Sequence, residues 1–263
     1  MPAAVWRLIV DEALPGEANM AADAAVLASR RARMCPPTLR LYRWEVPTVT
    51  LGRFQKIEGV DLAACEDRGF DVVRRPTGGR GVLHDDELTY SVVADLADGV
   101  PRGVVGSYQY LSAALADAYR TLGVDAELTR RSRGPGGSAA CYLHATQADL
   151  SLGAAKLSGS AQVWSGDTVL QHGSFVRTRD VEAESEVFML GEAGRASLAT
   201  SAITLADALG QAPSIEAIAD AVTGAFERVL GIRLEPGPLS ADEREHAAST
   251  ASTFAVHAAS RKA

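Results

Sequence analysis

The chain has 263 residues, 47% of them apolar, and a formal net charge of −7 at neutral pH. This length fits one large α/β domain or two small ones with a sizeable core, and the acidic balance argues against nucleic acid, whose binding needs clustered Lys and Arg. Three scattered cysteines indicate neither a disulfide framework nor a zinc site, and no apolar run approaches the roughly 18 residues of a membrane span. We therefore expect a soluble, cytoplasmic protein with no membrane partner.

The first half of the sequence predicts alternating strands and helices. We expect strands over residues 5–10, 39–44, 48–51, 70–73 and 87–93, and helices over residues 19–33, 61–68 and 105–122. Pro47 separates the second strand from the third, and we expect a tight turn between them. Asp61 is the expected N-cap of its helix, and Gly69 and Gly123 are expected to end helices.

The second half predicts a loop, several strands and a helical end. Residues 130–140 are too rich in Gly, Pro, Ser and Arg for a regular element, which should place Cys141 on or beside a loop. We predict strands over residues 124–128, 149–152, 156–163 and 168–176, then a helical portion from about 180, in which Ser214 caps a helix over residues 215–230 and a last helix covers residues 242–257.

The order of these elements bears on the fold class. We find no linker long enough to separate domains, so residues 1–263 are expected to form one domain. Strands and helices mix without regular βαβ alternation, which favours an α+β (mixed α/β) class over a doubly wound Rossmann fold.

Residues 74–91 (RRPTGGRGVLHDDELTYS) are the most informative segment. Adjacent Gly78 and Gly79 allow backbone amides to approach a ligand closely, and flanking arginines supply charge for a phosphate or carboxylate. The segment has neither the Gly-Lys-Ser/Thr ending of a Walker A loop nor the Gly-x-Gly-x-x-Gly spacing of a dinucleotide site. By itself the pattern also fits an ordinary turn.

Lys156 and Cys141 are two further candidates. Lys156 lies on a β-patterned stretch just before a turn of small residues (KLSGSAQ, residues 156–162), and Cys141 follows the flexible segment. Alone, a lysine is usually solvated and a cysteine is more often a small buried hydrophobe than a nucleophile. Together with the glycine-arginine loop, both become stronger candidates for functional residues.

In combination these segments resemble the family of lipoate-protein ligases and octanoyltransferases, which shares a fold with the biotin protein ligases. The resemblance covers about residues 6–177 with order and spacing preserved. It rests on Asn19-Met20-Ala21, residues 42–55 (YRWEVPTVTLGRFQ), residues 74–91, residues 156–162 and Leu170-Gln171-His172-Gly173-Ser174. The implied fold is a biotin/lipoate protein ligase-like catalytic domain with mixed β-sheets flanked by helices.

The resemblance also implies a set of site residues. Lys156 would lie nearest the reacting carbonyl, and the other binding residues for the acyl group would be Arg75, Thr77, Gly78, Gly79, His84 and Gly159. His84 would either shape the pocket or relay a proton. Many members read Gly-Gly-Gly where this chain has Gly78-Gly79-Arg80.

Ala140-Cys141, fifteen residues ahead of Lys156, resembles the LipM-type octanoyltransferases within the family. That branch implies octanoyl transfer from octanoyl-acyl carrier protein to a lysine of a lipoyl-domain protein, such as glycine cleavage H protein, in protein lipoylation. Cys141 would carry the acyl group as a thioester and Lys156 would assist. No cofactor and no metal would be required, and a monomer is expected.

Two alternatives stay open at this point. The first is an ATP-dependent lipoate-protein ligase, which would need ATP and Mg²⁺ and in which Cys141 is incidental. The second is a non-catalytic accessory protein that binds lipoyl domains, which retention of both Cys141 and Lys156 disfavours. An assay with octanoyl-acyl carrier protein without ATP, beside lipoate with ATP, separates these activities.

Overall fold

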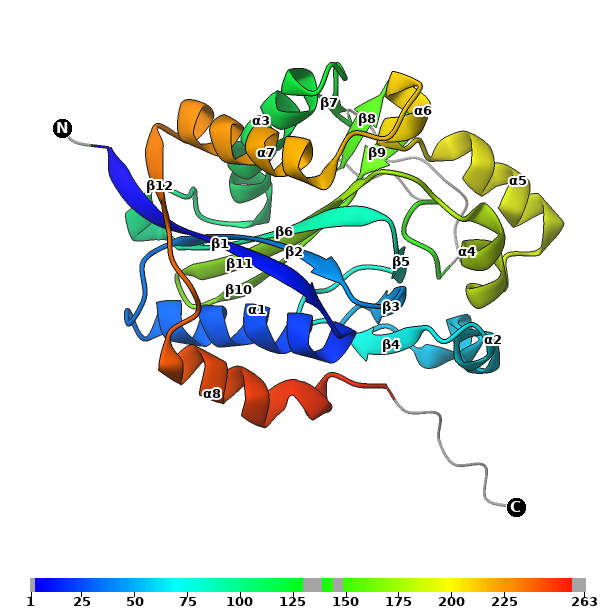
Figure 1. The fold of residues 1–263 in the computed structure, drawn as a ribbon, viewed down its shortest axis with the longest axis horizontal. Coiled ribbons are helices and arrows are strands. Elements are labelled where there is room, and N and C mark those ends of the chain that lie inside the picture. The colour runs from blue at the N-terminus through cyan, green and yellow to red at the C-terminus, as the bar shows by residue number, and fades with distance from the viewer. Residues whose placement is uncertain (1–2, 130–138, 144–148, 257–263) are drawn as a thin grey trace.

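The computed structural model describes residues 3–129, 139–143 and 149–256. Its largest element is a six-stranded mixed sheet with strand order β10-β11-β6-β2-β1-β12 (Figure 1). The strands are β1 Ala4–Leu14, β2 Thr38–Trp44, β6 Glu87–Asp95, β10 Ser160–Ser165, β11 Thr168–Val176 and β12 Ile232–Pro236. β1 pairs in parallel with β2 and β12, and the remaining pairs are antiparallel.

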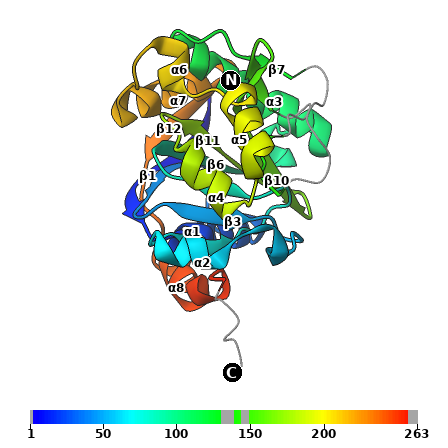
Figure 2. The same ribbon diagram turned by 90° about the vertical axis from the view of Figure 1, so that its right-hand side faces the viewer.

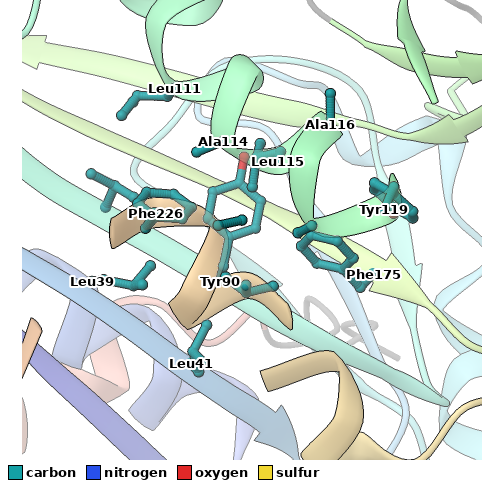
Figure 3. Packing of buried hydrophobic residues seen from close by; sticks show 14 of the residues in the cluster. Leu39, Leu41, Tyr90, Leu111, Ala114, Leu115, Ala116, Tyr119, Phe175 and Phe226 are labelled. Atoms are coloured by element: carbon teal, nitrogen blue, oxygen red, sulfur yellow. The ribbon is translucent and has the colours of Figure 1, made fainter. Parts of the chain in front are cut away.

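Helices cover both faces of this sheet. α3 (Val104–Thr121) and α7 (Ile215–Leu230) lie on one face, and α1 (Gly16–Arg31) and α8 (Ala241–Thr250) lie on the other (Figure 1). The main core fills the first face, where Tyr119 of α3 stacks on Phe175 of β11 with ring centroids 4.5 Å apart (Figure 3). Because side chains alternate along a strand, other side chains of β11 lie on the opposite face, where Leu170 packs in a cluster with Val26 of α1 and His172 contacts Asp23 of α1.

Two small sheets and several short helices complete the fold. One sheet contains β4 (Asp71–Arg74), β3 (Thr48–Leu51) and β5 (Val82–His84), and the other contains β7 (Glu127–Leu128), β8 (Leu150–Leu152) and β9 (Ala155–Ser158). The short helices are α2 (Leu62–Asp67), α4 (Val181–Val187), α5 (Gly191–Ser201) and α6 (Leu205–Leu209); α2, α4 and α5 come to the front in the turned view (Figure 2). None of the helices in the described ranges is long and apolar enough to cross a membrane.

The helix caps and stops predicted at Asp61, Ser214, Gly69 and Gly123 are confirmed. The Asp61 carboxylate accepts hydrogen bonds from the amides of Ala63 and Ala64, and the Ser214 hydroxyl accepts one from the amide of Ala217. Gly69 and Gly123 follow the ends of α2 and α3 with φ of 69° and 95°. These are left-handed conformations that glycine adopts without steric cost.

The short connection at Pro47 joins two sheets, since β2 lies in the six-stranded sheet while β3 pairs with β4 and β5. One predicted strand is wrong in its extent. The strand predicted over residues 156–163 is interrupted at Gly159, so that β9 pairs with β8 and β10 pairs with β11. The interruption carries the chain from one sheet to the other, close to Gly173, where a Cβ would lie 2.5 Å from the carbonyl oxygen of Gly159.

Other differences concern short elements and boundaries. β5 and β12 were not predicted, and β12 interrupts the C-terminal portion that was predicted to be helical. α1 begins at Gly16, ahead of the predicted start, and only Glu127–Leu128 of the strand predicted over residues 124–128 pairs. The last helix ends at Thr250, and the end predicted for it at His257 lies outside the described residues.

Candidate active site

Cys141 lies in a segment that is anchored to Gly81. The amide of Gly81 donates to the Ala139 carbonyl at 2.9 Å, and the amide of Cys141 donates to the Gly81 carbonyl at 2.8 Å. A larger residue at this position would meet the Phe188 ring, since a Cβ on Gly81 would lie 2.5 Å from Cε1 of Phe188. Cys141 itself is outside any helix or strand and is partly exposed, as the sequence predicted for a residue next to a loop.

Lys156 reaches Cys141 from β9. Its Nζ lies 3.4 Å from the Cys141 Sγ and donates to the Cys141 carbonyl at 3.3 Å. The same ammonium forms an ion pair with Asp149 at 3.0 Å, and the Lys156 and Asp149 side chains are only 1% and 3% exposed. A buried lysine needs such a partner, because an uncompensated charge in the interior is strongly destabilising.

The electrostatic setting keeps Lys156 charged. Burial alone would lower its pKa, but the negative charges of Cys141 and Asp149 outweigh burial, so the pKa of Lys156 is raised above its ordinary value. At neutral pH the group is therefore a fixed cation that donates hydrogen bonds. The ammonium therefore lies within reach of both the sulfur and the carbonyl oxygen of Cys141.

Gly159 lies close to the end of the Lys156 side chain. A Cβ on Gly159 would lie 3.1 Å from Cε and 3.2 Å from Nζ of Lys156. These separations are tighter than ordinary van der Waals contact, so any larger residue here would push the ammonium away from Cys141. Gly159 therefore holds Lys156 in place as well as lining the cavity described below.

Arg75 organises the glycine-arginine loop from inside. Its Nε donates to the hydroxyl of Thr77, and its Nη1 donates to the carbonyl and hydroxyl of Thr50. Its Nη2 donates to the carbonyls of Gly78 at 2.8 Å and Arg80 at 2.7 Å. With Nε, Nη1 and Nη2 all engaged by the protein, Arg75 shapes the loop around a buried guanidinium.

Thr77 connects this loop to a buried histidine. The Thr77 hydroxyl lies 2.7 Å from Nε2 of His172, and Nδ1 of His172 lies 3.1 Å from the Asp23 carboxylate. Burial lowers the pKa of His172 despite the nearby Asp23. A neutral His172 thus donates from Nδ1 to Asp23 and accepts the Thr77 hydroxyl proton at Nε2.

Asp23 is the anionic centre beneath the cavity. It is fully buried and pairs with Arg40 at 2.9 Å, while Ser91 donates to it at 2.7 Å. Burial would raise the pKa of Asp23, but the hydrogen bond from His172 and the charge of Arg40 outweigh burial and hold the pKa below its usual value. The charge of Asp23 is therefore compensated, and it fixes the tautomer of His172.

His84 has both ring nitrogens engaged. Its Nδ1 lies 2.7 Å from Oε1 of Glu87, its Nε2 lies 3.0 Å from the Thr50 hydroxyl, and its ring stacks on Trp44 at 4.4 Å. The Ser174 hydroxyl also donates to Glu87 at 2.7 Å. Of the two roles predicted for His84, these contacts support shaping the pocket over relaying a proton.

A cavity of about 530 Å³, part of it open to solvent, joins these residues. The predicted site residues Arg75, Gly79, His84, Cys141 and Gly159 line it, together with Met20, Tyr42, Trp44, Thr50, Val82, Thr89, Tyr142, Ser160, Ala161, His172, Gly173 and Ser174. Thr77 and Gly78 support this wall through their bonds to Arg75 and His172. Within the described residues, no three His, Cys, Asp or Glu side chains form a group suited to a metal ion.

Comparison with known proteins identifies the family. Residues 15–227 match the family described as the lipoyl protein ligase A/B catalytic domain. The chain belongs to this family. Among its relatives are the octanoyltransferase LipM of Kyrpidia tusciae, 40% identical over 92% of this chain and 93% of the relative, and that of Moorella thermoacetica, 40% identical over 93% of both. The family and its octanoyltransferase branch, predicted from the sequence, are confirmed.

Solved structures support the fold. A putative lipoate protein ligase from Thermoplasma acidophilum with bound lipoic acid superposes with a TM-score of 0.77 at 23% identity, covering 96% of both chains. A lipoate-protein ligase A bound with ATP gives a TM-score of 0.76 at 24% identity, covering 96% of this chain and 95% of the other. The predicted α+β, lipoate ligase-like fold is confirmed.

Three residues of the site were missed as functional candidates. Asp149 was predicted only as the start of a strand, His172 appeared only within a matching segment, and Asp23 was not singled out. A signal existed for Asp149, because a catalytic lysine on a strand between sheets must be buried and then requires a nearby carboxylate. Asp23 and His172 are 149 positions apart, and their pairing depends on packing of α1 against the sheet.

Proposed function

We propose that this protein is an octanoyltransferase that moves an octanoyl group to a protein lysine through a thioester on Cys141. The observation that carries the proposal is the 3.4 Å contact between the Lys156 ammonium and the sulfur of Cys141, a residue that lines the cavity. It is supported by relatives named octanoyltransferase LipM that are 33–40% identical over nearly the whole chain.

The first step loads the enzyme. The Cys141 thiolate attacks the carbonyl of a thioester donor, for which we propose octanoyl-acyl carrier protein. The new carbon–sulfur bond forms as the donor's carbon–sulfur bond breaks, and the released pantetheine thiolate takes a proton from water. Lys156 stabilises the attacking thiolate and the negative charge that develops on the carbonyl oxygen, which is the usual task of preorganised donors.

In the second step the acyl group passes from Cys141 to the acceptor lysine. The neutral amine of the acceptor lysine attacks the thioester carbonyl, an amide bond forms, and the Cys141 sulfur leaves. The proton lost by the attacking nitrogen ends on the departing sulfur or in water, so the step balances without another reactant. Because the pKa of Lys156 is raised, this residue remains a cation throughout and is poorly suited to act as a base.

The proposed relay uses neither ATP nor a metal, because the energy of the donor thioester drives amide formation. We propose a lipoyl-domain protein or glycine cleavage H protein as the acceptor. A solved structural neighbour from Thermoplasma acidophilum, a bipartite lipoate protein ligase, is described together with its E2 lipoyl domain, which makes this class of acceptor the natural first choice.

The test compares two donors and follows the protein by intact mass spectrometry. With octanoyl-acyl carrier protein and no ATP, we expect a hydroxylamine-sensitive octanoyl adduct that maps to Cys141 and passes to an added lipoyl domain. The Cys141→Ala variant should form no adduct. Modification of the lipoyl domain only with lipoate and ATP would identify a ligase, and no modification from either donor would leave a non-catalytic binding protein.

A further inference from the structure

The segment after α8 lies along the edge of β4. A short helical turn, Ala251–Thr253, leads into this segment. The amide of Arg74 donates to the Phe254 carbonyl and the amide of Val256 donates to the Val72 carbonyl, both at 2.8 Å. Val73 and Ala255 form an antiparallel bridge between these two bonds. The C-terminal segment thus acts as an added strand on a sheet that contributes Thr50, Val82 and His84 to the wall of the cavity.

Phe254 is the apolar side chain that this segment brings to the site. It packs against the buried cluster of Met20, Tyr42, Trp44 and Val73. Met20, Tyr42 and Trp44 also line the cavity. Phe254 therefore packs against a cluster that forms part of the cavity wall, although it is far from Cys141 in sequence and does not line the cavity itself.

This part of the cavity wall is deeply buried. Cys141 is partly exposed, whereas Met20 is 1% exposed and Tyr42 is fully buried. An acyl group whose carbonyl is bound at Cys141 must direct its apolar tail away from solvent, because burying each methylene contributes roughly 0.8 kcal/mol. The tail therefore ends near Met20, a flexible side chain that adapts to the space around it.

We propose that Phe254 sets the depth of the acyl pocket by supporting Met20, so that the C-terminal segment determines the acyl-chain length the enzyme accepts. The proposal rests on the proposed function and extends it to chain-length specificity. Removing the Phe254 ring leaves space into which Met20 can move, and the pocket then admits a longer chain without any change at Cys141 or Lys156.

The experiment compares acylation of the full chain by hexanoyl-, octanoyl-, decanoyl- and dodecanoyl-pantetheine, with rates read by intact mass. For Phe254→Ala we expect the decanoyl-to-octanoyl rate ratio to rise about tenfold, the effect of burying two further methylenes. Phe254→Leu should shift the ratio in the same direction by a smaller factor. It replaces Phe254→Ala as the test variant if the alanine variant does not fold.

Leu239→Ala is the matched control. Leu239 is also a partly buried apolar residue next to α8, but it packs against a different cluster, formed by Val26, Cys35, Val93 and Leu170. We expect this variant to lose stability and to keep the wild-type chain-length profile. A profile that shifts equally in Leu239→Ala, or equal rate losses for all donors in both Phe254 variants, would overturn the proposal.

Binding of free octanoate and decanoate to the Cys141→Ala protein, measured by calorimetry, separates this proposal from the proposed function. One outcome is that these acids bind and that adding Phe254→Ala shifts the preference towards decanoate, while the protein with Cys141 intact transfers no acyl group. The depth of the pocket is then as we infer and the transferase assignment fails. If transfer occurs but the Phe254 variants keep the wild-type preference, only the inference fails. If neither acid binds and no donor acylates the protein, both fail.

Discussion

Replacing Lys156 with arginine tests whether the position of its charge, rather than the charge alone, drives acylation. Arginine keeps a cation beside Asp149, so the buried carboxylate is not left unpaired and the variant should fold. The planar guanidinium is larger than an ammonium, however, and Gly159 leaves no space for it, since even a Cβ there would lie 3.1 Å from Cε of Lys156.

The size of the effect follows from the contact distance. An ammonium 3.4 Å from the Cys141 sulfur interacts with a thiolate by ~5 kcal/mol at an effective dielectric constant of ~20, and a charge centre moved to ~5 Å interacts by ~3 kcal/mol. This difference alone slows acylation ~10-fold. Loss of one hydrogen-bond donor to the developing oxyanion typically costs ~10²-fold or more, so we expect a combined loss of at least ~10²-fold.

The assay is the rate of octanoyl adduct formation by intact mass, beside circular dichroism and thermal unfolding to show that Lys156→Arg is folded. Asp149→Glu is a useful companion, because it perturbs the other end of the ion pair while keeping both charges. A folded Lys156→Arg protein that is acylated at a near-normal rate would refute the reasoning and reduce Lys156 to a general electrostatic role.

Three further predictions follow from the surrounding residues. Asp149→Asn removes one of the anions that raise the pKa of Lys156, so the alkaline limb of the acylation pH profile should move to lower pH; an unshifted limb would contradict this. Gly81→Ala places a methyl group against Phe188, and we expect slower acylation and destabilisation of ~1–3 kcal/mol in urea titrations. Asp23→Asn leaves Arg40 without its fully buried partner and should cost ~3–5 kcal/mol. The pKa of Asp23 is lowered in the folded state. The stabilisation from its charge is therefore present above ~pH 4 and is lost as pH falls through the pKa of the folded state. Wild-type stability should thus fall more steeply in acid than that of Asp23→Asn.

Local patterns in the sequence were enough to predict most elements, because caps and strand alternation depend on neighbouring residues. Asp61 and Ser214 cap their helices as predicted, and the strand over residues 168–176 has the predicted bounds. β12 could have been found by the same reasoning, since Ile232 and Leu234 are buried and Arg233 is exposed. This strand was not predicted because it is only five residues long and lies between two helices.

Pairing between distant segments could not be predicted in this way. A strand pattern does not reveal which sheet a strand joins, so the sequence did not predict that β2 and β3 lie in different sheets. The contact between Cys141 and Lys156 was expected only through the family resemblance. Its physical cause is long-range: Gly81 anchors the segment of Cys141, and the crossing at Gly159 places Lys156 opposite it.

Arg80 shows why a loop can depart from its family's sequence and keep its form. Among the described residues other than glycine, only Arg33 and Met189 have a positive φ, so Arg80 occupies an ordinary backbone region that any residue can adopt. The loop uses Arg80 through its carbonyl, which accepts from Arg75 at 2.7 Å, and that carbonyl is present whatever the side chain. Gly79 differs, because its φ is 96° and a Cβ there would lie 2.8 Å from Nη2 of Arg75. The second glycine is therefore required by the geometry of the loop, while the third position tolerates the side chain of Arg80.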